Sequence, residues 1–157
     1  MEWKSRVLLL QKAPLMTKED TPRSCGECSE CCIIASVCSD SPFNRENPDI
    51  PIWFKPMRKT CQFITPNGGG CRIYEDRPKD CREYTCEWLR GAPIRKPTES
   101  GVIFFAERTS REVVIMVGAR TDDVYEDEET KKEIQRYRDL GYPVVLMHDD
   151  GKRTLIE

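Results

Sequence analysis

The pattern of hydrophobic and polar positions is clearest in the last third of the chain, where it predicts two hairpins. Two β-rich apolar runs, 101–106 and 112–117, are joined by a short polar stretch. A second pair of runs, 144–148 and 154–156, flanks the sequence Asp-Asp-Gly. Asp-Gly is a strong signal for a tight hairpin turn. We therefore expect four strands in residues 99–157.

A helix is predicted between these hairpins. The acidic stretch 122–129 leads into 131–140, which carries bases toward its end and is followed by Gly141. Acid at the start, base at the end and glycine after the last turn are typical of a helix. The order ββαββ implies a small α+β unit with the helix on one face of the sheet. We interpret the acidic stretch as a solvated helix start rather than a site for a hard cation.

The first two thirds of the chain predict less regular structure. Residues 29–39 contain no helix breaker and could be helical up to Pro42. A proline-punctuated connection, 40–60, follows, and a structureless loop of that length is uncommon in a small domain. We expect Trp53 and Phe54 to pin this connection down as a local core, the alternative being an exposed binding patch.

A short hairpin and a helix are predicted next. The runs 61–65 and 71–74 flank a glycine-rich turn, so that a hairpin would bring Cys61 and Cys71 together. That turn lacks the Lys-Ser/Thr of a phosphate loop.

The helix after it has a start signal in Asp76-Arg77-Pro78 and a stop signal in Gly91. Cys81 lies in this helix. Cys86 would lie about 140° around it, so the two thiols share a face only if the helix breaks between them.

Composition and charge narrow the class of protein. The 157 residues suit one ordinary domain, but only 38% are hydrophobic against 33% charged, so a bound metal could help to hold the fold. The net charge of −2 gives no global field toward nucleic acid or anionic lipid. Residues 1–98 carry 16 Lys+Arg and 13 Asp+Glu, a net +3, whereas residues 99–157 carry 9 and 14, a net −5.

No export signal is expected at the N-terminus. The only compact apolar run there, 7–10, is shorter than the roughly 7 to 15 residues of a signal-peptide core and far shorter than a membrane span. We therefore expect a cytoplasmic protein without a membrane segment. In that reducing compartment, clustered cysteines are typical of metal-binding or catalytic sites rather than of disulfides.

All nine cysteines lie between residues 25 and 86, too tightly spaced to be nine independent core positions. The string Cys25-Gly-Glu-Cys28 has the form of a metal-binding knuckle. Four thiolates at about 2.3 Å make a tetrahedral zinc site, but an iron–sulfur cluster also takes four, so the number of cysteines leaves zinc and iron–sulfur open. With Cys38 set aside, eight thiols are enough for two metals.

The spacing also suggests that thiols are divided between centres. On a helix Cys28 and Cys32 are i and i+4 neighbours, whereas Cys31 points about 100° away from Cys32. Adjacent thiols on a helix do not easily chelate one metal together. Either Cys31 and Cys32 serve different centres, or one of them packs.

Other candidate chemistry is weaker. Residues 55–96 carry 10 Lys+Arg and 5 Asp+Glu, which we interpret as compensation for thiolate charge plus a solvated face, the alternative being a phosphate or nucleic-acid patch. His148, the only histidine, is expected at a hairpin end on the surface rather than as a ligand or base. We assign no catalytic and no cofactor-binding residue, because no Ser/His/Asp set can be assembled.

The cysteine pattern resembles a known family. Cys25-x2-Cys28-x2-Cys31-Cys32, then Cys61-x-Phe63, then the segment from Gly70-Cys71-x-Ile73-Tyr74-Glu75-x-Arg77-Pro78 to Cys81-Arg82-x-Tyr84-x-Cys86 is similar to the YkgJ-like cysteine-cluster family of zinc- or iron-chelating domains. Flagellin lysine N-methylases are similar in this module. The resemblance covers about residues 25–88 and implies metal chelation. It does not imply methylase activity, because the chain is short and has no glycine-rich cofactor fingerprint.

This resemblance implies eight ligands and leaves Cys38 outside the pattern. They are Cys25, Cys28, Cys31, Cys32, Cys61, Cys71, Cys81 and Cys86.

We therefore expect an α+β protein in three parts: an N-terminal arm, 1–24, a metal-stabilised cysteine-cluster module, 25–98, and a ββαββ unit, 99–157. The unit would pack on the module or meet a partner protein. The expected function is structural zinc binding, with an iron–sulfur protein of redox or enzyme-accessory role as the alternative. A nucleic-acid adaptor is a third hypothesis, which we do not favour because interleaved aromatic residues are scarce.

Overall fold

The computed structural model describes residues 23–40 and 52–156. Almost all of the predicted N-terminal arm, and residues 41–51 of the proline-punctuated connection, lie outside this part of the chain. Among the described helices, none has both the length and the apolar character needed to cross a bilayer.

Residues 102–156 form a mixed α/β unit with the four strands and the helix that the sequence pattern predicts. Its four strands lie in the order β3-β4-β5-β6. The β3–β4 and β5–β6 pairs are antiparallel hairpins, whereas β4 and β5 run parallel because a helix connects them. The elements are β3 (Val102–Arg108), β4 (Val113–Ala119), the 3₁₀ helix η2 (Asp122–Glu126), α5 (Glu128–Asp139), β5 (Val144–Met147) and β6 (Arg153–Ile156).

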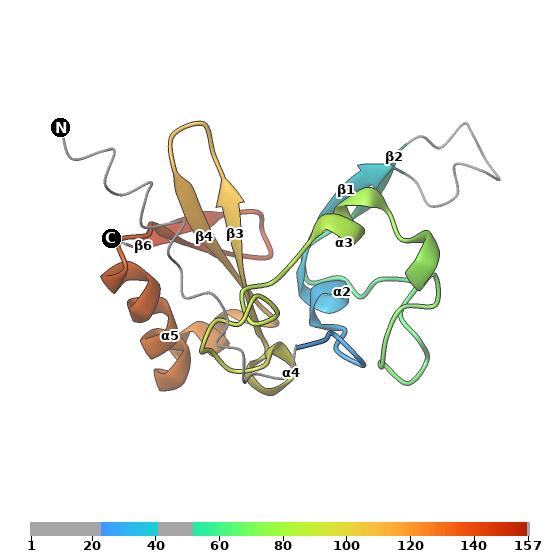
Figure 1. Ribbon diagram of the computed structural model, residues 1–157, viewed down its shortest axis with the longest axis horizontal. Coiled ribbons are helices and arrows are strands. Elements are labelled where there is room, and N and C mark those ends of the chain that lie inside the picture. Colours follow the sequence, from blue (N-terminus) through green and yellow to red (C-terminus); the bar gives the residue numbers. More distant parts are fainter. Residues whose placement is uncertain (1–22, 41–51, 157) are drawn as a thin grey trace.

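Both faces of this sheet are covered. Side chains alternate between the two faces of a strand. In β3, Val102 and Phe104 therefore face α5, whose Ile134 and Tyr137 belong to the same buried cluster. Ile103, which alternates with them, packs with Ile34 on the opposite face. Figure 1 shows α5 on one side of the sheet and α2 on the other. The continuous apolar run in β3 follows from this double burial.

The N-terminal part is built from short elements around a small hairpin. Strands β1 and β2 pair antiparallel, with Val37 opposite Lys55. The helices that flank this hairpin, α2 and α3, are each five residues long. The elements are α2 (Glu30–Ile34), β1 (Val37–Asp40), β2 (Ile52–Lys55), the 3₁₀ helix η1 (Tyr74–Asp76), α3 (Lys79–Glu83) and α4 (Pro97–Ser100).

The predicted helix over 29–39 is wrong beyond Ile34. The chain becomes extended at Ala35, with φ −69° and ψ 145°, and continues as β1. Pairing with β2 outweighs the absence of a local helix breaker. For Phe54, the local core expected from Trp53 and Phe54 is also wrong, because the Phe54 side chain is 63% exposed. The side chain of Trp53 lies outside the described part of the chain.

The predicted helix from Asp76 to Gly91 is wrong at both ends. Arg77 has φ −55° and ψ 145°. A residue before proline is pushed out of the helical region, so Pro78 prevents a helix from starting at Asp76. The chain becomes extended again at Tyr84. Cys81 therefore lies in α3, whereas Cys86 lies beyond the end of the helix, and the angle of about 140° expected between them does not apply.

The cysteine-rich part and the sheet are held together by two contacts of α2. Ile34 is fully buried against the sheet at Gly118, where an added Cβ would lie 2.9 Å from Ile34 Cγ2. Glu30 is 2% exposed, and its carboxylate accepts a hydrogen bond from Arg120 Nε at 2.7 Å and a second from Arg120 Nη2. A buried carboxylate needs such a partner.

We predict that Gly118→Ala loosens this contact. The new methyl group would press on Ile34, Met147 and Ile103 together. Overpacking of this kind costs about 1–3 kcal/mol of unfolding free energy. Chemical denaturation measures the loss. Gly69→Ala is the control, since its added Cβ meets Glu27 side-chain atoms only at 3.6 Å or more. Equal stability of the two variants would contradict the proposed close contact.

Candidate metal centre

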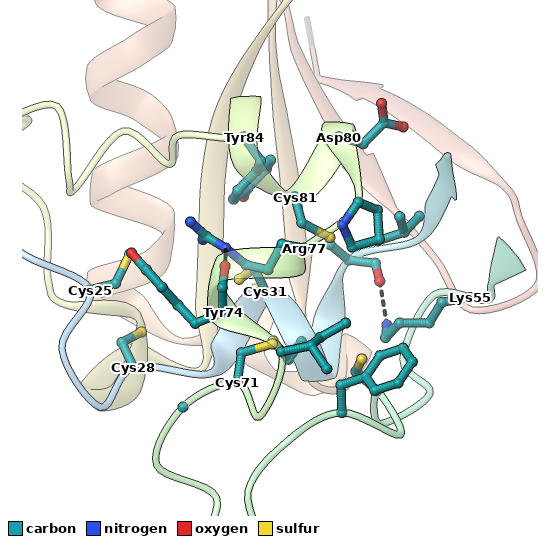
Figure 2. A pocket seen from close by; sticks show the side chains of 18 of the residues that line it. Cys25, Cys28, Cys31, Lys55, Cys71, Tyr74, Arg77, Asp80, Cys81 and Tyr84 are labelled. Atoms are coloured by element: carbon teal, nitrogen blue, oxygen red, sulfur yellow. Dashed lines mark hydrogen bonds between the residues drawn. The ribbon is translucent and has the colours of Figure 1, made fainter. Parts of the chain in front are cut away.

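Most of the predicted ligands line one cavity of about 270 Å³ between the cysteine-rich part and the sheet. The sheet contributes Phe105 and Met147 to its wall. Figure 2 shows Cys25 and Cys28 on one side of this cavity and Cys71 and Cys81 farther across it, with Cys31 between. The cysteines that line it are Cys25, Cys28, Cys31, Cys32, Cys61, Cys71 and Cys81.

A tight turn and a helix place the first cysteine group. Gly26 has φ +50°, a conformation that favours glycine, and Cys28 N–H donates to Cys25 C=O at 2.7 Å. The backbone therefore makes a tight turn where the sequence predicts a metal-binding knuckle. Cys31 and Cys32 follow in α2.

The second cysteine group is tied to the first by backbone hydrogen bonds. Cys61 N–H donates to Cys32 C=O at 2.8 Å. The buried Ser29 hydroxyl donates to Gly68 C=O at 2.7 Å and accepts from Gly70 N–H at 2.9 Å. The glycine-rich turn is therefore fastened to the start of α2, and the two distant groups converge.

The hairpin predicted over 61–74 is shorter than expected. It consists of one antiparallel bridge between Ile64 and Cys71, and Arg72 N–H donates to Phe63 C=O at 2.8 Å. Cys71 nevertheless reaches the same cavity as Cys61. Cys38, which the sequence pattern left aside, lies in β1 opposite Phe54.

Cys86 is the one predicted ligand outside the cavity lining, but it is close enough to the other thiols to interact with them electrostatically. Cys25, Cys28 and Cys31 raise the pKa of its thiol, after burial, which is the largest cause. For Cys81, burial and then the nearby thiols of Cys31, Cys61 and Cys71 raise the pKa to about 11. The strongest thiol neighbours of Cys86 are thus in the first cysteine group and those of Cys81 are mostly in the second, with Cys31 a neighbour of both.

The described thiols are free, and they do not form a closed coordination shell. All eight are without a disulfide. Within residues 23–40 and 52–156, no three Cys, His, Asp or Glu side chains lie in a group that could hold an ion. Coordination by four thiolates would therefore require side chains to turn toward one point.

The donor set nevertheless fits a thiophilic cation. Burial and neighbouring thiols raise the pKa values of Cys25 and Cys28, so forming several thiolates here needs a compensating positive charge. Tyr84 lines the same cavity, and its buried hydroxyl has no hydrogen-bond partner among the described residues. A thiolate held near it would accept that hydrogen bond.

Two of the cavity residues were not singled out by sequence reasoning. Lys55 ends β2 and is only 4% exposed, and burial lowers the pKa of its ammonium group below the ordinary 10.5. No local signal marks it, because strand pairing alone turns it inward. Tyr84 did carry a signal, since it is part of the motif between Cys81 and Cys86.

The basic residues near the second cysteine group are mostly on the surface. Arg72 and Arg82 are exposed and donate to backbone carbonyls of Gln62 and Arg77. Arg77 lines the cavity, and its guanidinium stacks 3.7 Å above the centroid of the Tyr74 ring. This arrangement agrees with the expected mixture of charge compensation and solvated face.

His148 is at a hairpin end, as predicted, and not among the cavity-lining residues. Its Nδ1 lies 3.1 Å from Asp122 Oδ1 and its Nε2 lies 2.9 Å from Thr154 Oγ1. Its side chain is partly buried, at 22% exposure. Arg58 Nη2 also lies 2.5 Å from Asp122 Oδ1. Arg58, Asp122 and His148, which we call the Asp122 cluster, therefore join the cysteine-rich part to the sheet.

The chain was compared with protein-family models, with curated proteins and with solved structures, and none of the three comparisons found a match.

We predict that the Asp122 cluster makes stability fall in acid. The hydrogen bond from Arg58, and then that from His148, hold the pKa of Asp122 below its ordinary 3.8. A depressed pKa contributes stability that is present above the unfolded-state pKa and is lost as pH falls through the folded-state pKa. Asp122→Asn should therefore lower stability by about 0.2–1 kcal/mol at pH 7, the range of exposed ion pairs, and by less at pH 2–3.

Denaturant unfolding at pH 7, 4 and 2.5 measures this difference. Asp123→Asn, at the exposed neighbouring position, is the control. A loss for Asp122→Asn that does not shrink in acid would refute the ion-pair explanation.

Proposed function

We propose that this protein binds zinc through its cysteine cluster and that the metal is mainly structural. The observation that carries the proposal is the convergence of seven free thiols from three separated segments on one cavity. Thiolates are the preferred ligands of structural zinc. With a small apolar supply and very short helices, this part of the chain would gain folding energy from such a crosslink.

The neighbourhoods of the thiols support two centres. Cys25, Cys28 and Cys86 belong to one set, and Cys61, Cys71 and Cys81 to the other. Cys31 and Cys32 are adjacent in α2, between the sets. Each set then reaches four ligands if the two helix cysteines serve different centres. We propose all eight as ligands on this basis.

An iron–sulfur protein with a redox or enzyme-accessory role is the second candidate, favoured by the size of the cavity. Four thiolates at about 2.3 Å enclose one zinc ion with almost no free space. A cavity of about 270 Å³ has room for a larger inorganic core. Four thiolates suit such a cluster equally well.

We also propose membership of the YkgJ-like family, a cytoplasmic location and a partner protein. The Tyr84 hydroxyl, which is part of the family motif, is buried in the cavity wall. Free thiols at eight positions agree with a reducing compartment. The sheet face next to the cluster is covered by α2, so a partner would have to meet another surface.

Elemental analysis with an acid-labile sulfide assay tests the proposal. The full chain is purified without oxygen and without added metal. We expect zinc at one to two ions per chain, no sulfide and no visible absorption. Iron with stoichiometric sulfide would instead establish the second candidate. A folded chain that contains neither metal, and takes up neither on titration, would refute both.

We predict that Cys71→Ser lowers metal content and stability, whereas Cys38→Ser does neither. Loss of one ligand leaves an incomplete site. The metal affinity of the centre that contains Cys71 should fall by at least about tenfold, because a strong bond is lost. Metal content and thermal unfolding, each with and without chelator, measure the effects. Equal losses in the two variants would show that the ligand assignment is wrong.

A further inference from the structure

A buried ammonium group forms part of the cavity wall. Lys55 is 4% exposed, and its Nζ donates to Ala35 C=O and, at 3.2 Å, to Pro56 C=O. An ammonium group has three N–H donors, so among the described residues one donor of Lys55 is left without an acceptor. Within the described part of the chain, no carboxylate forms an ion pair with Lys55.

The groups around Lys55 that could balance its charge are thiols. Cys61 has the strongest electrostatic influence on it, followed by Cys32, Cys31 and Cys81. All of these cysteines line the same cavity as Lys55. A buried charge without a counter-charge is strongly unfavourable, so at least one of these sulfurs is the natural site for an anion.

Lys55 lies at one end of the cavity, away from Cys25 and Cys28 (Figure 2). Figure 2 shows it reaching into the cavity from the side opposite Cys25 and Cys28. The thiols with the largest electrostatic influence on Lys55 are Cys61, Cys32, Cys31 and Cys81. Strand β2 ends at Lys55 and pairs with β1, so the placement of the ammonium group follows from the backbone and not from a flexible surface side chain.

We propose that Lys55 donates its third N–H to a metal-bound thiolate of the set formed by Cys32, Cys61, Cys71 and Cys81. This inference rests on the proposed metal binding and goes beyond it. The hydrogen bond lowers the negative charge and the nucleophilicity of that thiolate. The cations that act on Cys25 and Cys28 are Arg77 and Lys96, which are only half-buried, whereas Lys55 is buried. The thiolates of that set therefore receive less charge compensation and are the more reactive toward electrophiles. Lys55 is thus a positioning and charge-balancing residue.

Alkylation of the zinc-loaded full chain by iodoacetamide tests this inference, with each cysteine followed by peptide mass spectrometry. In the unmodified chain, Cys61 and Cys32 should react more slowly than Cys25 and Cys28. Lys55→Met removes the charge and the donors at similar side-chain length. It should accelerate the reaction of Cys61 or Cys32 by on the order of tenfold, the effect of one charge-assisted hydrogen bond, and leave Cys25 and Cys28 unchanged.

Two further variants separate this role from a general effect on folding. Lys59→Met, at an exposed lysine four residues on, should react as the unmodified chain does. Lys55→Gln keeps N–H donors for the Ala35 carbonyl but no charge, and it should reproduce the selective acceleration even if Lys55→Met does not fold. Equal acceleration of all cysteines, or none at Cys61 and Cys32 in both Lys55 variants, would overturn the inference.

The same experiment distinguishes this inference from the proposed function. Zinc uptake by the unmodified chain is measured first, and its failure would refute zinc binding and the role of Lys55 together. Zinc uptake with no selective change in the Lys55 variants would refute only the role of Lys55.

Discussion

The packing of Ile34 against Gly118 is the contact on which the arrangement of this protein depends. The sheet has one face under α5, and its other face is apolar and has to be buried as well. Gly118, the next-to-last residue of β4, lets α2 approach closely enough to do this. Because Cys31 and Cys32 lie in the same short helix, burial of the sheet also sets the position of the thiols.

Polar contacts then give this packing one orientation. The buried carboxylate of Glu30 holds Arg120 at the end of β4, and the Ser29 hydroxyl holds the glycine-rich turn. These adjacent residues of α2 and its N-terminus thus point to different parts of the molecule. A shift of α2 would leave buried polar groups without partners, which is unfavourable, so the two cysteine groups stay opposed across one cavity.

Electrostatics gives the cavity its chemical character. Burial and mutual repulsion both disfavour several thiolates in so small a volume. The buried ammonium of Lys55 and the guanidinium of Arg77 offset only part of this charge. A bound cation would offset the rest, and it would also supply the crosslink that an N-terminal half made of five-residue helices and four-residue strands gains from most.

The sequence by itself determined the parts that local physics decides. The hairpin turns, the capped helix α5 and the order ββαββ follow from residue periodicity and from turn and capping residues. Cysteine spacing predicts that thiols bind metal, and the set of eight candidate ligands is what the resemblance of the cysteine motif to a known family implies. Where prolines or strand pairing compete with helix propensity, local reasoning failed: Pro78 blocks the helix at Asp76, and pairing with β2 ends α2 at Ile34.

Only the tertiary structure decided which distant groups share the cavity. Phe105 and Met147 come to it because strand alternation directs them to the face under α2, and Lys55 because β2 ends beside α2. No residue near these positions in the chain signals that placement. Contacts between segments far apart in sequence depend on which apolar faces are left to bury after each element has formed, and that is a property of the whole fold.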